Sequence, residues 1–261
     1  MPTVSLVDRA LLHVTGADAR PFLQGLLTND VLSLSPERPL WAGLLSPQGK
    51  ALFDMILFDD GAGGLWIDCE AARADELAKR LTMYKLRRAV AIERTGLCTL
   101  ATWGGELRDG WPDDPRLAAL GQRSPGYPDQ AEPDNGRYAA YRIALGVPEG
   151  AGELGVDKTL WLETNAVELN GVSFAKGCYV GQENTARMYY RDRVRRRLLP
   201  VRIDSEPGAA TKLMAGEREA GELRARAGDI GMAWLRIELA ERELRLGEAN
   251  ARVKWPEWLP R

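Results

Sequence analysis

The sequence predicts an α+β protein whose C-terminal part is a compact antiparallel β-barrel. In the first hundred residues, strand-like apolar segments alternate with amphipathic helical segments, which favours an α+β sandwich. After residue 198 the pattern changes to short alternating segments between glycine-containing turns, which favours a small barrel. We therefore expect interleaved α+β subdomains at residues 1–195, with a possible insertion at about 47–121, followed by a barrel at residues 196–261.

Hydrophobic periodicity predicts the elements of the first region. The expected β-strands are residues 4–14, 41–45, 51–58, 65–69, 89–93 and 97–103. The runs at 51–58 and 65–69 flank a glycine-rich turn, which predicts a hairpin. A first helix is expected to start at residues 15–18. A second, over residues 71–84, is expected to point Leu77, Leu81 and Tyr84 inward.

The middle of the chain is rich in turn signals. Residues 111–135 contain many proline, glycine and aspartate residues, so we expect a loop with one strand near residues 116–120. Residues 137–145 are expected to be helical because Gly146 and Pro148 follow as stop signals.

The expected barrel rests on five short segments. They are residues 199–203, 211–215, 219–227, 228–237 and 248–253. Trp255 and Trp258 lie just beyond the last segment, and we expect them to close the barrel.

Composition limits the possible functions. The chain has 45% hydrophobic and 28% charged residues and a net charge of −2, so no overall field points to nucleic acid or to an anionic membrane. No apolar run approaches the roughly 20 residues that span a bilayer, and the N-terminus lacks the features of a signal peptide. An odd number of cysteines without a CxxC spacing argues against a disulfide framework and predicts a cytoplasmic protein.

Several catalytic and metal-binding classes are disfavoured. The single histidine, His13, lies in a strand-like segment without an accompanying GxSxG sequence, so no histidine-based triad is expected. A zinc or cluster site within one chain needs about four soft ligands. One histidine and three scattered cysteines (Cys69, Cys98 and Cys178) do not supply them, so no resident metal is expected. No Walker A or GxGxxG sequence supports a nucleotide site.

Residues 176–183, Lys-Gly-Cys-Tyr-Val-Gly-Gln-Glu, are the most distinctive stretch of the chain. Two glycines bracket Cys178 and Tyr179, and a helix is expected to start directly afterwards. A helix N-terminus favours an anion. A thiol placed there, with Lys176 nearby, is therefore expected to lose its proton more easily than a free cysteine. From spacing alone, a tight turn with a buried and inert cysteine is the competing interpretation.

This octapeptide resembles the signature of the YgfZ-type folate-binding family. Members of that family resemble the T-protein (aminomethyltransferase) of the glycine cleavage system and assist iron–sulfur enzymes. Residues 16–30 and 141–148 are also similar to the family. The resemblance implies a T-protein-like fold around a central folate cavity, with tetrahydrofolate or a derivative as cofactor and iron–sulfur client or assembly proteins as partners. T-proteins have no cysteine in this loop, so Cys178 favours the YgfZ-type function.

The resemblance also implies roles for individual residues. Cys178 is expected to be a reactive thiol that faces the cavity, with Lys176 stabilising its thiolate. Asp54 is expected to contact folate, the competing interpretation being a solvent-facing position in a strand. Glu163 and Asn165 correspond to a polar pair close to folate, although Glu163 also suits a loop carboxylate. The other expected cofactor-binding positions are Gly177, Tyr179, Gly181, Gln182, Glu183 and Arg187.

Two other functions remain open at this level. A folate-dependent aminomethyl transferase would use Asp54 and Glu163 to position the cofactor, so enzymatic turnover is undecided. Six arginines between residues 187 and 197 favour a solvated linker face. Such a run also suits RNA, in an RNA-modification factor, or the anionic tail of a polyglutamylated folate. Nucleic acid and membranes are not the expected partners.

Overall fold

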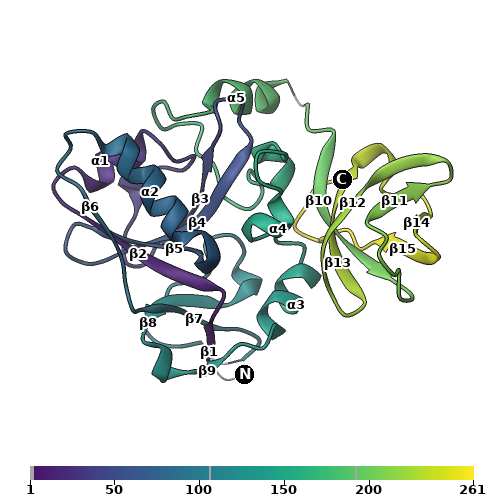
Figure 1. Ribbon diagram of the computed structural model, residues 1–261, viewed down its shortest axis with the longest axis horizontal. Coiled ribbons are helices and arrows are strands. Elements are labelled where there is room, and N and C mark those ends of the chain that lie inside the picture. The colour runs from purple at the N-terminus through teal and green to yellow at the C-terminus, as the bar shows by residue number, and fades with distance from the viewer. Residues whose placement is uncertain (1–2, 106, 192) are drawn as a thin grey trace.

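Three β-sheet units organise the chain, of which the structure describes residues 3–105, 107–191 and 193–261. The computed structural model contains a five-stranded sheet, a four-stranded sheet and a closed barrel (Figure 1). The two open sheets and their helices form the larger part of the molecule, and the barrel stands at the other end of its long axis (Figure 1). The predicted α+β architecture with a C-terminal antiparallel barrel is confirmed. The exact domain boundaries stay a prediction.

The five-stranded sheet carries two helices. Its strands, in spatial order, are β3 (Leu40–Leu45), β4 (Ala51–Asp59), β5 (Leu65–Glu70), β2 (Arg9–Thr15) and β6 (Ala91–Arg94). Neighbouring strands are antiparallel, and β4 and β5 form the predicted hairpin. The helices α1 (Ala19–Gln24) and α2 (Ala74–Lys85) share one apolar core with this sheet. The prediction that Tyr84 points inward is wrong. It is 45% exposed because it lies in the last turn of α2, next to the exposed Leu86.

The four-stranded sheet begins with the first strand of the chain. Its strands, in spatial order, are β8 (Gln122–Gly126), β7 (Cys98–Thr102), β1 (Val4–Leu6) and β9 (Glu132–Pro133). β1 is antiparallel to β7 and parallel to β9. The prediction of one strand over residues 4–14 is wrong in part, because a turn at Val7 and Asp8 carries the chain from this sheet into the other. The chain thus leaves the four-stranded sheet after β1, forms the whole five-stranded sheet, and returns to the first sheet at β7.

Short helices connect the sheets to the barrel. α3 (Arg137–Ala144) confirms the helix predicted over residues 137–145, and α5 (Gln182–Tyr190) starts where residues 176–183 predict it. The other helical elements are α4 (Gly150–Leu154) and the 3₁₀-helices η1 (Val31–Ser33), η2 (Ala71–Arg73), η3 (Ala118–Leu120), η4 (Pro128–Gln130), η5 (Trp161–Thr164) and η6 (Ile237–Leu239).

The segment before β8 differs from its prediction. The strand predicted near residues 116–120 is wrong, because η3 occupies this stretch. Gly121 follows with a φ of +80°, and a Cβ atom there would lie 2.1 Å from the Thr102 carbonyl oxygen. The glycine therefore lets the chain turn tightly against β7 and enter β8. Across the described ranges, no helix is long and apolar enough to cross a membrane.

A second core holds the sheets, the connecting helices and the barrel together. Trp41 of β3 and Trp161 of η5 are fully buried, with ring centroids 4.8 Å apart. A Cβ atom at Gly43 would come within 3.0 Å of the Trp161 ring, so η5 packs directly on the sheet. Leu198 and Met232 reach this core from the barrel. Burial of these apolar side chains fixes the barrel to the larger region.

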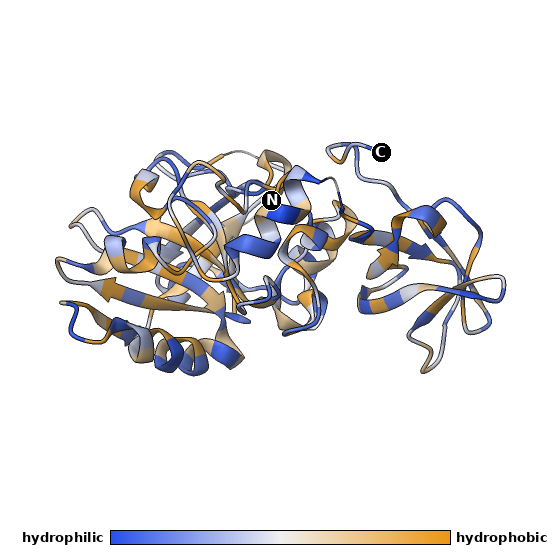
Figure 2. Cartoon of the chain, turned by 90° about the horizontal axis from the view of Figure 1, so that it is seen from above, coloured by the Kyte–Doolittle hydropathy of each residue, from blue (hydrophilic) through white to orange (hydrophobic). Residues whose placement is uncertain are grey.

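The barrel closes through six strands, one more than predicted. In spatial order they are β10 (Arg196–Ile203), β13 (Ile230–Arg236), β12 (Arg218–Ala227), β11 (Lys212–Ala215), β14 (Leu244–Leu246) and β15 (Ala249–Val253). β14 was missed because it is only three residues long. Hydrophobic and hydrophilic bands alternate along these strands (Figure 2), as in strands with one buried face.

The two C-terminal tryptophans lie at the end of the barrel but have different partners. Trp255 and Trp258 both pack against the barrel core. The Trp255 indole N–H donates to the Leu259 carbonyl oxygen, whereas that of Trp258 donates to the Leu145 carbonyl oxygen, each at 2.8 Å. Trp258 therefore also ties the barrel to the end of α3.

Candidate functional site

The loop of residues 176–183 presents one exposed cysteine between two buried side chains. Lys176 and Tyr179 are each 7% exposed, whereas Gly177 and Cys178 between them are exposed. The other two thiols are inside the protein. Cys69 of β5 and Cys98 of β7 are buried, and burial raises the pKa of Cys69 to about 12 and raises the pKa of Cys98. The alternative of a buried cysteine is therefore wrong for Cys178, while its reactivity stays a prediction.

Lys176 anchors the loop to the end of α1. Its ammonium group donates hydrogen bonds to the carbonyl oxygens of Gln24 and Leu27, and it lies 5.0 Å from the centroid of the Tyr179 ring. Burial lowers the pKa of Lys176 to about 8 and raises that of Tyr179 to about 12. Within the described residues, no hydrogen bond joins Lys176 to Cys178. Its proposed action on the thiolate stays a prediction.

Gly181 fastens the other end of the loop. It is the residue before the first turn of α5, with a φ of +84°, and a Cβ atom there would lie 2.6 Å from the Ser46 carbonyl oxygen. Only glycine meets both conditions without strain. Asn184 strengthens this contact by donating to the Gln48 carbonyl oxygen at 2.9 Å. Around Gly177 a Cβ atom would meet nothing within 4 Å, so the first glycine is under no such constraint.

The remaining predicted residues of α5 lie at its surface. Gln182 is half-buried, Glu183 is exposed, and no side chain of the described residues caps the helix. The Arg187 guanidinium donates to the Asn184 side-chain oxygen at 2.8 Å and is exposed. These residues surround Cys178 in the chain, but the structure gives them no shared buried site.

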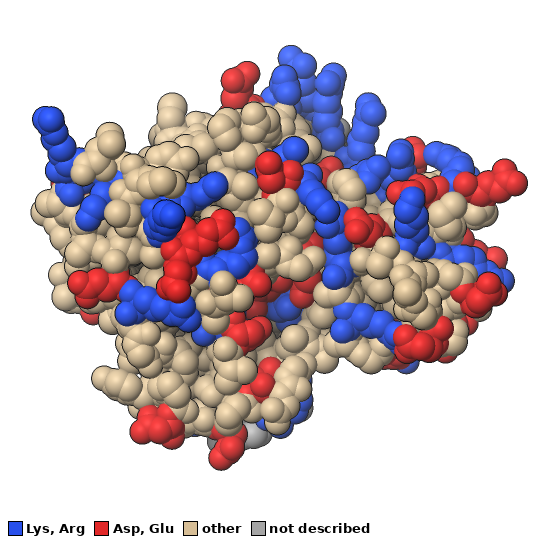
Figure 3. Space-filling model, viewed as in Figure 1, with Lys and Arg blue, Asp and Glu red and all other residues tan. Residues whose placement is uncertain are grey.

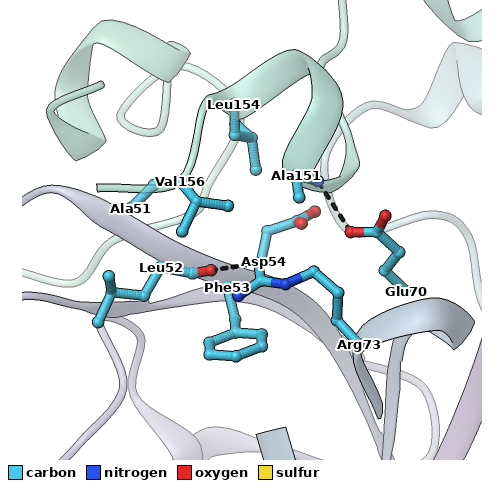
Figure 4. Close-up of a pocket in the computed structure, with 9 residues that line it drawn as sticks. All are labelled: Ala51, Leu52, Phe53, Asp54, Glu70, Arg73, Ala151, Leu154 and Val156. Atoms are coloured by element: carbon cyan, nitrogen blue, oxygen red, sulfur yellow. Dashed lines mark hydrogen bonds between the residues drawn. The ribbon is translucent and has the colours of Figure 1, made fainter. Parts of the chain in front are cut away.

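Asp54 lies on β4 beside a narrow hollow under α4 (Figure 4). It is 5% exposed, so the solvent-facing interpretation is wrong. Its Oδ1 atom accepts a hydrogen bond from the Gly150 N–H at 3.1 Å, and burial raises the pKa of its carboxyl group. The other lining residues are Ala51, Leu52, Phe53, Glu70, Arg73, Ala151, Leu154 and Val156.

A pterin ring does not fit this hollow. Its volume is about 10 Å³, which is room for about one water molecule. Glu70 accepts from the Ala151 N–H at 2.9 Å and Arg73 donates to the Leu52 carbonyl oxygen at 2.7 Å, which closes two sides (Figure 4). A buried carboxyl suits the amidine-like edge of a pterin, but the space does not. Cys178 does not line this hollow, so the two predicted features are separate.

A buried ionic network beside Asp54 was missed by the sequence analysis. It consists of four arginines and four carboxylates, all at most 8% exposed, namely Arg9, Arg116, Arg123, Arg142, Asp68, Asp114, Glu149 and Glu153. Glu149 accepts from both Arg116 and Arg123 at 2.7 Å. Because Arg9 lies on β2 and Arg123 on β8, the network ties the two sheets together.

The network holds its charges in the ionised form. Burial opposes ionisation of Glu149, but the attraction of Arg123, Arg9 and the neighbouring arginines holds its pKa well below the usual value. A signal was present in the sequence, since Arg9 opens an apolar strand and Arg142 lies in an apolar helix. Because arginine is almost never fully buried unless it is paired, an arginine inside an apolar segment indicates a buried ion pair.

Glu163 and Asn165 connect η5 to the barrel. The Glu163 carboxylate accepts from the Leu160 N–H and from the Trp234 indole N–H, both at 3.1 Å, and burial raises its pKa. Asn165 donates to the Leu198 carbonyl oxygen at 2.7 Å and accepts from Arg197 at 2.9 Å. The two predicted polar residues are therefore close to each other, and both are buried where η5 meets strands β10 and β13 of the barrel.

The arginine run divides into two parts. Arg187, Arg191, Arg193 and Arg195 are exposed, as a solvated face requires. The prediction is wrong for two others. Arg196 lies over the Trp234 ring at 4.1 Å, and Arg197 pairs with Glu168 at 2.7 Å. Asp192, within the run, lies outside the described residues.

Comparison with known proteins places the chain in a family. Residues 195–261 match the family model described as the CAF17 C-terminal beta-barrel domain. The chain is 33% identical to the mitochondrial iron-sulfur cluster assembly factor IBA57 of Mus musculus, over 98% of this chain and 84% of that protein. It is also 33% identical to the Homo sapiens protein of the same name, with the same coverage.

A solved structure shares the fold. The glycine cleavage system aminomethyltransferase T from Bartonella henselae superposes with a TM-score of 0.74 at 14% identity, covering 98% of this chain and 86% of that one. This likeness shows the fold, and the predicted T-protein-like architecture is confirmed. The expectation of a cytoplasmic protein is contradicted, because the relatives are mitochondrial proteins. By sequence the chain belongs to the IBA57 family of iron–sulfur cluster assembly factors, within the YgfZ-type proteins that share the T-protein fold.

Proposed function

We propose that this chain is an iron–sulfur cluster assembly factor that works through the thiol of Cys178. The names and identity of its relatives support the first part of the proposal. The exposure of Cys178, between the buried anchors Lys176 and Tyr179, is the observation that carries the second part. A thiolate at the surface can bind iron or exchange with another thiol, whereas buried thiols such as Cys69 cannot.

The chain would share a cluster rather than hold one alone. A cluster takes about four soft ligands, and the described residues contain no group of three or more His, Cys, Asp or Glu side chains arranged to hold a metal ion. His13 is engaged with Asp60 at 2.9 Å and stacks on Trp66. In this proposal Cys178 loses its proton to solvent and takes one iron coordination position, while a second protein supplies the remaining ligands.

Reconstitution of a client enzyme tests this proposal. The purified chain is incubated with iron, sulfide, a thiol reductant and an apo form of a [4Fe–4S] enzyme, and the recovered activity is measured. We expect the chain to raise the recovery and Cys178→Ser to reduce it to the level without the chain. Cys69→Ser is the matched control, because it removes a thiol from the interior. Equal recovery with Cys178→Ser would reject a role for this sulfur.

We also propose that the chain binds tetrahydrofolate. The resemblance to the folate-binding family and the buried carboxyl group of Asp54 support this. Because a pterin exceeds the hollow beside Asp54, binding there requires α4 to move away from β4. Calorimetry with tetrahydrofolate, repeated with Asp54→Ala, tests this. A binding heat that is lost in Asp54→Ala supports the contact between folate and Asp54. If the wild-type chain gives no binding heat, the proposal that it binds tetrahydrofolate is rejected.

Transfer of a one-carbon unit from a lipoyl-bound donor to tetrahydrofolate would instead indicate a transferase.

A further inference from the structure

Three aromatic rings gather at the end of α5, of which those of Tyr189 and Tyr190 are exposed and that of Phe174 is half-buried. Phe174 stacks on Tyr189 with ring centroids 4.0 Å apart and 17° between the planes, and Tyr190 meets Tyr189 edge-on at 5.2 Å. Tyr189 is 43% exposed and Tyr190 is 73% exposed. Tyr189 and Tyr190 therefore leave an ordered aromatic patch open to solvent, with the half-buried Phe174 stacked against Tyr189.

Exposed arginines flank this patch in the chain. Arg187, Arg191, Arg193 and Arg195 are exposed, and none forms an ion pair within the described residues. Three exposed arginines of the barrel do form ion pairs, namely Arg202 with Asp229, Arg218 with Glu238 and Arg226 with Glu206. Figure 3 shows Lys and Arg side chains gathered above α5 and the segment that leads to β10. We call the three rings and four arginines the α5 surface.

The α5 surface lies beside the reactive loop. Phe174 and Cys178 belong to the same loop, four residues apart, so their Cα atoms are at most about 14 Å apart. Phe174 stacks on Tyr189 near the end of α5, and Gly181 lies at the start of the same helix. The loop therefore runs back along the helix, and a protein bound to the α5 surface has Cys178 within reach.

We propose that the α5 surface is the docking site for an acidic iron–sulfur protein, an inference that rests on the proposed function. Tyrosine and arginine are among the residues enriched at protein interfaces and in their energetic centres. Four exposed arginines complement an acidic surface and accelerate its approach. A thiolate-ligated cluster is itself anionic, so such a partner would present negative charge toward Cys178.

RNA is the other class of macromolecule that arginines and aromatic rings attract, and the geometry favours protein. Single-stranded binding needs open ring faces for successive bases. Phe174 and Tyr189 already cover one face of each other, which leaves Tyr190 as the most open ring. The chain has a net charge of −2, so it has no overall positive potential that would attract the phosphate backbone of RNA.

Binding of an acidic [2Fe–2S] ferredoxin, used as the probe, tests the docking site. Calorimetry at 50 mM and 300 mM salt compares the wild-type chain with Arg191→Glu/Arg193→Glu/Arg195→Glu and with Tyr190→Ala. We expect salt-sensitive binding, with an affinity loss of about tenfold or more for each variant. The matched control is Lys79→Glu/Arg87→Glu/Arg88→Glu, which reverses three exposed charges on α2 and the following loop and is expected to change the affinity less than about twofold. Circular dichroism confirms that each variant is folded.

Three results would overturn the docking site. These are no ferredoxin binding at 50 mM salt, equal losses in the α5 variants and the α2 control, or tighter binding of an oligo-uridine than of ferredoxin. Cys178→Ser separates this inference from the function on which it rests. If ferredoxin binds this variant normally and client recovery is lost, both stand. If recovery is unchanged while docking depends on the arginines, the docking site stands and the role of the sulfur fails.

Discussion

The Lys176 ammonium lies 5.0 Å from the centroid of the Tyr179 ring, and these two buried side chains bracket the exposed thiol of Cys178. A cation over an aromatic face contributes about 2 kcal/mol or more when desolvated. The hydrogen bonds from Lys176 to the end of α1 add to this attraction. The loop is thus fixed from inside while its sulfur stays outside, which lowers the ordering cost of any contact that the sulfur makes.

Alkylation rates should separate the three thiols. Burial raises the pKa of Cys69 to about 12 and that of Cys98 above its usual value, whereas Cys178 is exposed. With iodoacetamide at pH 7.5 we expect Cys178 to react at least about tenfold faster than the other two thiols. Mass spectrometry of the modified peptides over time measures the three rates. The fast phase should vanish in Cys178→Ser and persist in Cys69→Ser. Modification of Cys69 or Cys98 at the Cys178 rate in the folded protein would contradict the structure.

The two glycines of the loop should differ in their tolerance of alanine. Gly181→Ala places a Cβ atom 2.6 Å from the Ser46 carbonyl oxygen at a φ of +84°, so we expect a loss of about 1–3 kcal/mol in the free energy of unfolding. Gly177→Ala meets nothing within 4 Å, and we expect a change within about 0.5 kcal/mol. Urea denaturation of both variants measures the difference. Equal losses would mean that Gly181 is not fixed against the turn at residues 46–49.

Lys176 should make stability depend on pH. Its pKa falls from 10.5 to about 8 on folding, so between these values the folded chain binds fewer protons than the unfolded chain. The contribution of Lys176 to stability therefore rises as the pH rises from 8 toward 10.5. Relative to Lys176→Met, the wild-type chain should gain on the order of 2 kcal/mol between pH 7.5 and pH 10. Urea denaturation at both pH values tests this, and a constant difference between the two proteins would place the ammonium in solvent.

The ionic network should be costly to break from one side. Arg123→Met leaves Glu149 and Asp68 with fewer partners in the interior, so we expect a loss of about 3–5 kcal/mol in the free energy of unfolding. Arg218→Met is the control, because its pair with Glu238 has both side chains 61% exposed and is worth at most about 1 kcal/mol. Chemical denaturation compares the two variants. Similar losses would show that Arg123 is not enclosed as described.

Local patterns in the sequence predicted the local structure well. The hairpin of β4 and β5, the helix α3 and the start of α5 at Gln182 all follow from periodicity and turn residues. β14 escaped because three residues carry too little pattern. The break between β1 and β2 was missed because no glycine or proline marks the turn at Val7 and Asp8.

Long-range pairings set the limit of prediction at the site. The motif located Cys178, but the Lys176 ammonium turns inward to carbonyl oxygens about 150 positions earlier in the chain, at Gln24 and Leu27. Asp54 lies on its predicted strand, yet the closeness of α4 decides the size of the hollow beside it. Such distances depend on tertiary packing, which a single sequence does not encode as a local pattern.

Restoration of client activity in cells that lack the mitochondrial relative is the sharpest test of the role of Cys178 in cluster assembly. The wild-type chain, Cys178→Ser and Cys69→Ser are expressed at equal levels in mitochondria, and the activity of a [4Fe–4S] enzyme is measured. We expect full restoration by the wild-type chain and Cys69→Ser, and none by Cys178→Ser. Restoration by Cys178→Ser to the wild-type level would contradict this role.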